Sequence, residues 1–283
     1  MHTTSTTNWV LSTPELLELI LLHLDLRTLL TCAPLVCHFW NTLIQQSTPL
    51  QETLYFKPIK PKHHPSNANA SIARTLNPLL VDSFPAIFHQ NGTVFPQNKE
   101  PFSLTDLDMV RRPEKRDSYL RPEASWRRML IQQPPATKLG VFSWSGGMFG
   151  YGFVYEVQEL TPTERYDGIR MEMLFNPLIF HRNLAPTFNP ASIYWWGECS
   201  SPLIRRHLSE VGVTTLPDVI LCMCAMVSCT DPESDFENEE VEVVEGVRGW
   251  FRGRGMDGGL EGLGKQGGGG WEKSIYEKRG SWD

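Results

Sequence analysis

The sequence predicts an α+β protein with a helical head, a mixed middle domain and a disordered tail. Residues 9–56 are rich in Leu, contain no Gly, and repeat apolar residues at the spacing of amphipathic helices. After a Lys-, Pro- and His-rich linker at 57–75, residues 76–230 alternate helix-like and strand-like segments. From residue 231 to 283 the chain is first acidic and then Gly-rich, which is typical of segments that cannot build a packed core.

Composition argues against several classes of protein. A formal net charge of −6 disfavours nucleic acid as a partner, because phosphate binding needs clustered excess Lys and Arg. The longest apolar runs, Leu19–Leu22 and Val219–Val227, are far shorter than the roughly 20 residues that span a bilayer. Six cysteines without a basic leader segment indicate free thiols in a reducing compartment. We therefore expect a cytoplasmic or nuclear protein with no nucleic-acid or membrane partner.

The first helix of the head is expected to begin around Pro14 and to run to Leu24. Pro14 suits a first helical turn, and Ser12 followed three residues later by Glu15 has the form of a capping box. At 100° per residue, one arc of roughly 140° holds five apolar residues, while Leu19 and Leu22 fall outside it. The five residues in the arc are Leu16, Leu17, Ile20, Leu21 and Leu24.

Two further helices are expected in the head. Asp25 can cap a short helix that carries Leu26, Leu29 and Leu30. Pro34 can begin a third, whose apolar residues follow the i, i+3, i+4, i+7 rule. These residues are Val36, Phe39, Trp40 and Leu43. Three helices this short cannot bury so much apolar surface among themselves, so the surplus predicts a partner surface in the chain or in another protein.

One set of residues in the head stands in a distinctive order and spacing: Leu11, Pro14, Glu15, Leu16, Leu17, Ile20, Leu21, Leu24, Leu29, Leu30, Val36, Cys37 and Trp40. In this order and spacing the head resembles a known docking module, the F-box. Segments 48–56, 77–80, 84–85, 124–130 and 133–135 resemble recurring phrases of uncharacterised fungal F-box proteins. Two departures from the common motif are that Pro14 directly precedes Glu15, and that His38-Phe39 replaces the usual basic pair before Trp40.

The resemblance implies a substrate-receptor subunit of a Skp–cullin–F-box ubiquitin ligase that performs no bond chemistry itself. The head would bind the Skp-type adaptor, and through it cullin, while the middle domain would bind an unknown protein target. The adaptor-binding residues implied are Pro14, Leu16, Leu17, Ile20, Leu24, Val36, Cys37 and Trp40. Three alternatives stay open: a Leu-rich hairpin that caps the next domain, an F-box protein that works outside a ligase, and an F-box fused to a small enzyme domain.

The middle domain shows helix and strand signals in alternation. The strand patterns on either side of Ser145–Gly147 predict a hairpin. The expected strands are 139–142, 152–157, 192–196 and 219–227, and the expected helices are 123–131 and 204–211. Wherever aromatic residues reach the surface of this domain they would be candidates for target recognition. The four to consider are Trp144, Tyr151, Trp195 and Trp196.

Motifs for catalysis or cofactor binding are not matched in the sequence. Gly146–Gly150 lacks the spacing of a nucleotide-binding loop, and Ser143 and Ser145 lack the glycines of a nucleophile elbow. Three cysteines in an apolar strand favour buried thiols over a zinc site, since no fourth ligand is close. These cysteines are Cys222, Cys224 and Cys229. We therefore expect no catalytic residue, no cofactor and no metal.

The tail is predicted to be disordered and dispensable. Residues 231–245 hold eight carboxylates and no Lys or Arg, and the tail as a whole holds 13 of the 22 glycines. Arg-Gly pairs at 248–255 leave an RNA-binding segment as an alternative interpretation.

Overall fold

A computed structural model gives the structure of the chain, which divides into two compact units. The first unit holds residues 1–79 and 129–135, and the second holds 80–128 and 136–283. The structure describes part of the chain. The described residues are 6–59, 74–88, 102–147, 150–160, 167–180, 191–197, 199, 201–210, 212–213, 215–226, 235–256 and 271–280.

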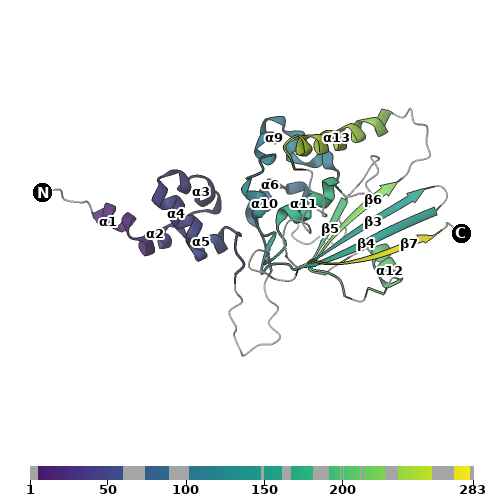
Figure 1. The fold of residues 1–283 in the computed structure, drawn as a ribbon, viewed down its shortest axis with the longest axis horizontal. Helices are drawn as coiled ribbons and strands as arrows, with labels where there is room; N and C mark the ends of the chain where they lie inside the picture. The colour runs from purple at the N-terminus through teal and green to yellow at the C-terminus, as the bar shows by residue number, and fades with distance from the viewer. Residues whose placement is uncertain are drawn as a thin grey trace, which may run out of the picture. The chain divides into compact units, whose positions relative to one another are not determined.

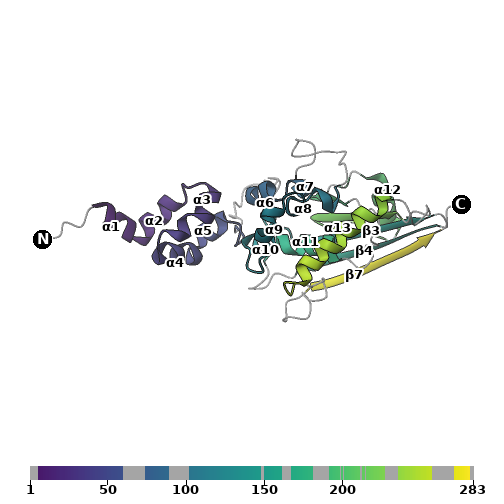
Figure 2. The same cartoon turned by 90° about the horizontal axis from the view of Figure 1, so that it is seen from above.

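The first unit is helical, as its Leu-rich sequence predicts (Figures 1 and 2). Short α-helices and one 3₁₀ turn (η1) follow one another with few residues between them. They are α1 (Thr6–Ser12), α2 (Pro14–Leu21), α3 (Leu26–Thr31), η1 (Ala33–Leu35), α4 (His38–Gln46) and α5 (Thr48–Thr53). Their shared core is Leu-rich and almost fully shielded from solvent. It consists of Leu17, Leu21, Leu29, Ala33, Ile44, Leu50 and Leu54.

The start of α2 differs from the predicted capping box. Ser12 is the last residue of α1, and Thr13 is the N-cap of α2 but accepts no hydrogen bond there with its side chain. Instead the Thr13 hydroxyl donates to the carbonyl of Trp9 over 3.0 Å, which links α2 back to α1. The Asp25 cap is as predicted, because its carboxylate accepts the Thr28 N–H at 2.9 Å.

The predicted third helix is two elements in the structure. Pro34 lies in the 3₁₀ turn, and Cys37 is extended with φ −164° and ψ 168°, so α4 begins only at His38. Leu35 and Val36 therefore precede α4 and are not part of that helix.

The first unit is closed by a segment distant in the sequence. The N–H of Leu130 donates to the carbonyl of Tyr55 at 2.8 Å, and the N–H of Asn77 donates to that of Ile131 at 2.9 Å. Strands β1 (Thr75–Leu76) and β2 (Gln132–Gln133) pair antiparallel beside these bonds. The division into 76–230 as one domain therefore differs from the structure, which assigns 76–79 and 129–135 to the helical unit.

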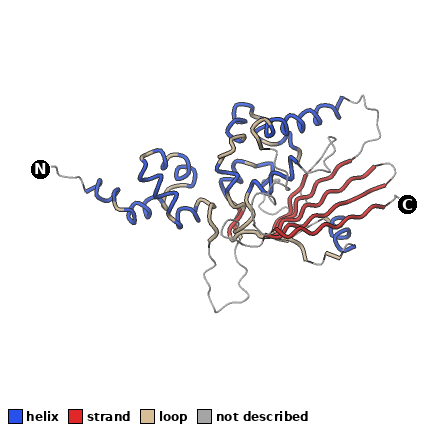
Figure 3. The backbone as a smooth tube through the Cα atoms, viewed as in Figure 1, coloured by secondary structure: helices blue, strands red, loops and turns tan. Residues whose placement is uncertain are grey.

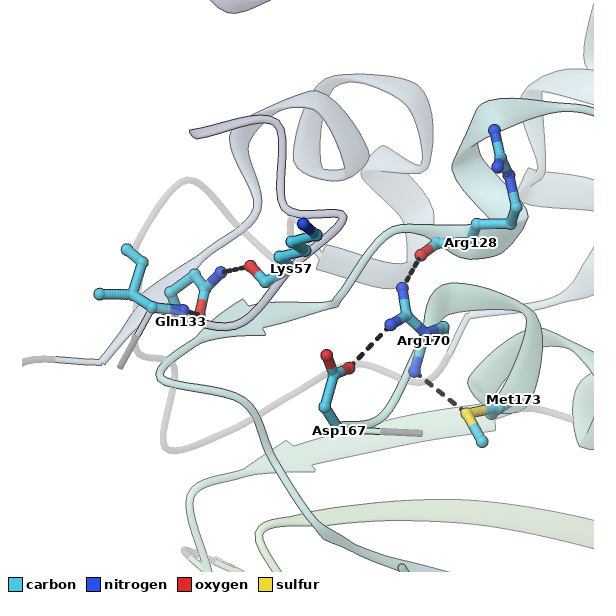
Figure 4. A network of polar contacts seen from close by, with 7 residues as sticks. Lys57, Arg128, Gln133, Asp167, Arg170 and Met173 are labelled. Carbon is cyan, nitrogen blue, oxygen red and sulfur yellow. Dashed lines mark hydrogen bonds and ion pairs between the residues drawn. The ribbon is translucent and has the colours of Figure 1, made fainter. Parts of the chain in front are cut away.

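Gln133 anchors this closing segment with its side-chain amide. Its Nε2 donates to the carbonyl of Lys57 at 2.7 Å, and its Oε1 accepts the N–H of Ile59 at 3.1 Å (Figure 4). Because the chain becomes extended from residue 129, the predicted helix 123–131 shortens to α10 (Ser125–Arg128).

The second unit is a five-stranded mixed sheet with helices, so the predicted α+β class is confirmed (Figure 3). The strand order is β5-β6-β3-β4-β7, with β3 and β6 parallel and the other neighbours antiparallel. The strands are β3 (Lys138–Gly147), β4 (Gly150–Leu160), β5 (Ala191–Trp195), β6 (Val219–Met226) and β7 (Trp271–Gly280). The first four confirm the predicted strands, and β3 with β4 forms the predicted hairpin.

Helices of the second unit cover both faces of this sheet. Ile204 and Leu208 of α12 pack on Phe142, Ile220 and Cys222 of the central strands. Figure 1 shows α13 on the opposite side of the sheet. The helices are α6 (Pro78–Ser83), α7 (Pro85–Phe88), η2 (Leu104–Asp106), α8 (Asp108–Arg111), α9 (Pro113–Tyr119), α10, α11 (Met171–Phe180), α12 (Pro202–Glu210) and α13 (Asp235–Arg252).

The predicted disorder of residues 231–283 is wrong for two of its segments. Residues 235–252 form α13, in which Val247 and Phe251 are almost fully buried. The ring of Phe251 lies 5.7 Å from that of Phe175, and the Arg248 Nε donates to the carbonyl of Ile179 at 2.8 Å. Residues 271–280 form β7, which pairs along β4. The Gly-rich residues 257–270 lie outside the described part of the chain.

Candidate functional site: an exposed apolar surface on the helical unit

Helix α2 is apolar on two adjoining faces, only one of which is buried. Leu17 and Leu21 lie in the core, whereas Leu16, Leu19 and Ile20 are 36%, 57% and 41% exposed. At 100° per residue the exposed three fall within one arc of about 100°, beside the buried pair. Helix α2 therefore presents a continuous apolar stripe to solvent.

The turn before α4 adds a second group of exposed apolar residues. Leu35 is 83% exposed, and Val36 and Phe39 are also exposed. The 3₁₀ turn and the extended Cys37 cause this, because they carry the chain outward between Ala33 and Ile44, both of which are buried.

A cleft lies between the junction of α1 with α2 and the start of α4. It is lined by Leu11 and Ser12 at the junction of α1 and α2, and by Cys37, Phe39 and Trp40 at the start of α4. Its volume is about 510 Å³, and the polar side-chain groups of its lining residues are a hydroxyl, a thiol and the indole N–H of Trp40. None of the five lining residues is Asp, Glu, Lys or Arg.

We call this region the docking surface. It comprises the cleft and the exposed apolar residues around α1, α2 and α4, which are Trp9, Leu16, Leu19, Ile20, Leu35, Val36 and Phe39. Exposed apolar residues scattered singly are ordinary, but a gathering in one small helical unit is typical of interaction sites.

The eight residues predicted to bind an adaptor divide into three groups by burial. Pro14, Leu16, Ile20, Val36 and Cys37 are exposed. Leu24 and Trp40 are partly buried against the core. Leu17 is fully buried, so it supports the unit from inside and cannot be touched from outside in this structure.

Sequence reasoning missed several members of the docking surface. Leu19 was left outside the expected apolar arc, although a Leu on the second face of an already amphipathic helix is itself a signal of exposure. The exposure of Leu35 and Phe39 is not apparent if Pro34 begins one continuous helix, and Trp9 precedes the first helix that the sequence predicts, which starts around Pro14.

Two ionisable groups of the helical unit, Asp25 and Tyr55, form hydrogen bonds outside the docking surface. The hydroxyl and the N–H of Thr28 both donate to the Asp25 carboxylate, and these bonds hold the pKa of Asp25 below its usual value. Burial raises the pKa of Tyr55, whose hydroxyl donates to the carbonyl of Leu76 at 3.4 Å. Both contacts favour the folded form of the helical unit at neutral pH.

The aromatic residues that were considered for target recognition in the second unit are less exposed than the docking surface where their side chains are described. Trp195 is buried and stacks on Phe88 with 5.3 Å between ring centroids, so it belongs to the core. Trp196 is partly buried and takes a positive φ of 61° in the turn that ends β5. The side chains of Trp144 and Tyr151 lie outside the described part of the structure.

Buried polar residues of the second unit are used in internal pairs. The Arg127 guanidinium donates to the carboxylate of Glu172, and His207 lies 3.3 Å from the carboxylate of Glu210 while stacking on Phe142. The guanidinium of Arg170 donates to Asp167 at 2.7 Å and to the carbonyl of Arg128, as Figure 4 shows. These pairs connect helices and loops to one another.

The cysteines and helices of the described part of the chain bear on metal binding and on membrane insertion. Cys199 and Cys222 are buried, and burial raises the pKa of the Cys199 thiol. Among the described residues no group of three His, Cys, Asp or Glu side chains is placed to hold a metal ion. None of the described helices is long and apolar enough to cross a membrane. Cys224 and Cys229 lie outside the side chains that the structure describes.

Comparisons with known proteins give no relative from which a function could be transferred. The chain matches no protein-family model, and neither a curated protein nor a solved structure resembles it significantly. Functional inference therefore depends on the residues themselves.

Proposed function

We propose that the helical unit binds a Skp-type adaptor and that the protein is a substrate-receptor subunit of a cullin–RING ubiquitin ligase. The observation that carries the proposal is the agreement between two independent features of the same residues. Leu16, Ile20 and Val36 stand at motif positions of the F-box resemblance, and they are exposed although apolar.

Burial of this surface by a partner is energetically favourable. Each apolar side chain removed from water contributes about 1.5–3 kcal/mol when its burial is complete, before the costs of association are subtracted. Burial of the exposed residues of the docking surface would therefore contribute favourably to a complex. Their lack of charge also favours an apolar partner groove over an anionic one.

The second unit would then supply target recognition. An adaptor-binding module only tethers the protein to a ligase, so another part must hold the target near the ubiquitin-charged enzyme. Such tethering acts by raising effective concentration and requires no catalytic residue in the receptor. In this role the protein is a binding subunit and not an enzyme.

Affinity purification of the full-length protein from its own cells, followed by mass spectrometry, tests the proposal. We expect the Skp-type adaptor and cullin in the purified complex, together with a protein whose abundance rises when the gene is deleted. The variant Ile20→Ala/Val36→Ala should lose adaptor and cullin together. Recovery of the adaptor without cullin would mean that the protein acts outside a ligase, and recovery of neither would contradict the proposal.

Ile59→Ala is a matched control for this experiment. Ile59 is 45% exposed, which is close to the 41% of Ile20, and it lies in the same unit but after α5. An effect of Ile20→Ala/Val36→Ala that Ile59→Ala does not share is therefore specific to the docking surface and not a consequence of removing exposed apolar area.

A further inference from the structure

Strand β7 forms one edge of the sheet in the second unit. It pairs with β4 on one side, and in the described part of the chain no strand pairs along its other side. Figure 2 shows β7 along the margin of the sheet. An edge strand presents a row of backbone N–H and C=O groups on which another strand can add.

In the β4–β7 register, no charged residue of β7 stands directly opposite a residue of opposite charge. The register sets each of them opposite a residue that is uncharged or of the same charge. It pairs Glu272 with Glu159, Lys273 with Gln158, Glu277 with Val154, Lys278 with Phe153 and Arg279 with Gly152. Cross-strand pairs stabilise a sheet when charges are opposite and destabilise it when they are alike. Directly opposite pairs with β4 therefore do not account for this charge pattern.

The same charges are complementary to an identical strand. Consider two copies of β7 that run antiparallel about a twofold axis at Ile275. Each residue then stands opposite a residue of suitable type. The resulting pairs are Trp271 with Arg279, Glu272 with Lys278, Lys273 with Glu277, Ser274 with Tyr276, and Ile275 with itself. All four Glu–Lys pairs across the axis are of opposite charge, and a Trp–Arg pair is also favourable.

Neighbouring registers lose this match. With the axis at Tyr276, Lys273 would stand opposite Arg279, which is a like-charge pair. With the axis at Ser274, every charged residue of β7 would stand opposite an uncharged one. The charge pattern thus selects the register centred on Ile275.

We propose that β7 pairs with the β7 of a second copy of this chain, antiparallel and centred on Ile275. The two five-stranded sheets then form one continuous sheet across a twofold axis. Such an interface is isologous, so both free β7 edges are used and assembly stops at the dimer. Lysines on an edge usually deter pairing, but here each lysine meets a glutamate of the second copy. The proposal uses the second unit alone and does not depend on adaptor binding.

Sedimentation equilibrium of the full-length protein over a range of concentrations tests the dimer. We expect a reversible monomer–dimer equilibrium for the unmodified chain. Lys273→Glu places two glutamates opposite each other at each of the two 273–277 pairs of the interface, and Glu277→Lys places two lysines there. Each variant should raise the dimer dissociation constant by about tenfold or more. Their partners on β4, Gln158 and Val154, are uncharged, so the folded monomer should be kept.

Restoration of the charge pairs gives the decisive comparison. An equimolar mixture of the Lys273→Glu chain and the Glu277→Lys chain should form a heterodimer, because each new charge then meets its opposite. The double variant in one chain should also regain the homodimer, and it serves if a single variant does not fold. A chain that stays monomeric at its solubility limit would overturn the proposal. A dimer insensitive to both reversals, or one not rescued by mixing, would do the same.

Discussion

Neighbouring residues of α2 have opposite roles that follow from their angular positions. Leu17 is buried among Leu21, Leu29 and Ile44, whereas Ile20 faces solvent on the adjoining stripe. Composition alone does not separate the two, since both are large and aliphatic. The direction in which each projects decides whether it stabilises the unit or binds a partner.

Substitution to Ala should therefore affect the two residues differently. Leu17→Ala leaves a cavity in the core and should lower the free energy of unfolding by about 2–5 kcal/mol. Ile20→Ala removes exposed surface and should change it by less than about 1 kcal/mol. Urea unfolding followed by circular dichroism measures both. Equal destabilisation by the two variants would show that the assignment of core and surface is wrong.

Tyr119 is a buried phenol whose titration bears on the second unit. Its hydroxyl donates to the carbonyl of Ser83 at 2.8 Å, and its ring packs edge-on against Phe84. Burial, followed by the negative charge of Asp108, raises the pKa of Tyr119 to about 12, against a smaller opposing effect of Arg112. The folded protein therefore holds this proton at a pH where the unfolded chain has released it.

The raised pKa of Tyr119 predicts a loss of stability in alkali. The contribution of protonated Tyr119 to the free energy of unfolding is fully present below the ordinary tyrosine pKa of 10.0. It is lost as the pH rises from there towards the folded-state pKa of about 12. Tyr119→Phe should remove this part of the decline, so the stability difference between wild type and variant should shrink as the pH rises. Thermal unfolding between pH 8 and about 11 measures it. A difference that stays constant with pH would contradict the assignment.

At the scale of elements, α13 is the clearest departure from the sequence-based expectation. Eight carboxylates between residues 231 and 245 dominate the local composition and suggested disorder. A stripe at i, i+4, i+7 and i+8 was present nevertheless, in Val243, Val247, Trp250 and Phe251. Phe251 completes an aromatic cluster with Phe175, and Arg116 lies 3.6 Å from the ring centre of Trp250. Helix formation here depends on tertiary contacts that composition does not report.

Phe251→Ala should destabilise the second unit by about 3–5 kcal/mol, because Phe251 is 1% exposed within that aromatic cluster. Arg252→Ala is the control, since the side chain of Arg252 is 57% exposed on the next position of the same helix. The melting temperature should fall clearly for the first variant and little for the second. If removal of residues 235–283 left the melting temperature unchanged, α13 and β7 would not be parts of the fold.

Strands were predictable where both of their faces are buried, because such strands have continuous apolar sequences. Residues 219–223 of β6 are a continuous apolar run and are all buried, and the Gly pair near Ser145 marked the hairpin of β3 and β4. Strand β7 was not predictable in this way, because an edge strand of alternating charges has no apolar run. Only its place in the sheet reveals it.

At the scale of the whole molecule, the two units are interleaved in the sequence. Local patterns predicted helices between about residues 14 and 44, including the Asp25 cap, but they merged η1 and α4 into one helix and did not predict α5. They did not reveal that residues 129–135 return to this unit, because that pairing joins residues more than 50 positions apart. The docking surface was likewise only half predictable. The predicted adaptor-binding residues Leu16, Ile20 and Val36 belong to it, but Trp9, Leu19 and Leu35 were missed, because exposure depends on which face of each helix the core covers.

Asn77 tests whether the distant segment is a structural part of the helical unit. Its side chain is fully buried, donates to the carbonyl of Leu130 at 3.0 Å and accepts the N–H of Leu79 at 3.0 Å. Asn77→Ala removes the hydrogen bonds to the Leu130 carbonyl and from the Leu79 N–H. The loss should lower the free energy of unfolding by about 1–3 kcal/mol. Exposed Thr75→Ala is the control. Unfolding should be followed by the fluorescence of the Trp residues. An Asn77→Ala protein as stable as the control would contradict the closure.

The most direct test of the proposed function is calorimetric titration of the full-length protein with a purified Skp-type adaptor. Saturable one-to-one binding is predicted. Ile20→Ala should weaken it by about 1–2 kcal/mol, while Ile59→Ala should leave it unchanged. Circular dichroism before each titration should show that the variants keep their helices. A folded protein that does not bind the adaptor, or one whose affinity is the same after Ile20→Ala and Val36→Ala are combined, would contradict the account.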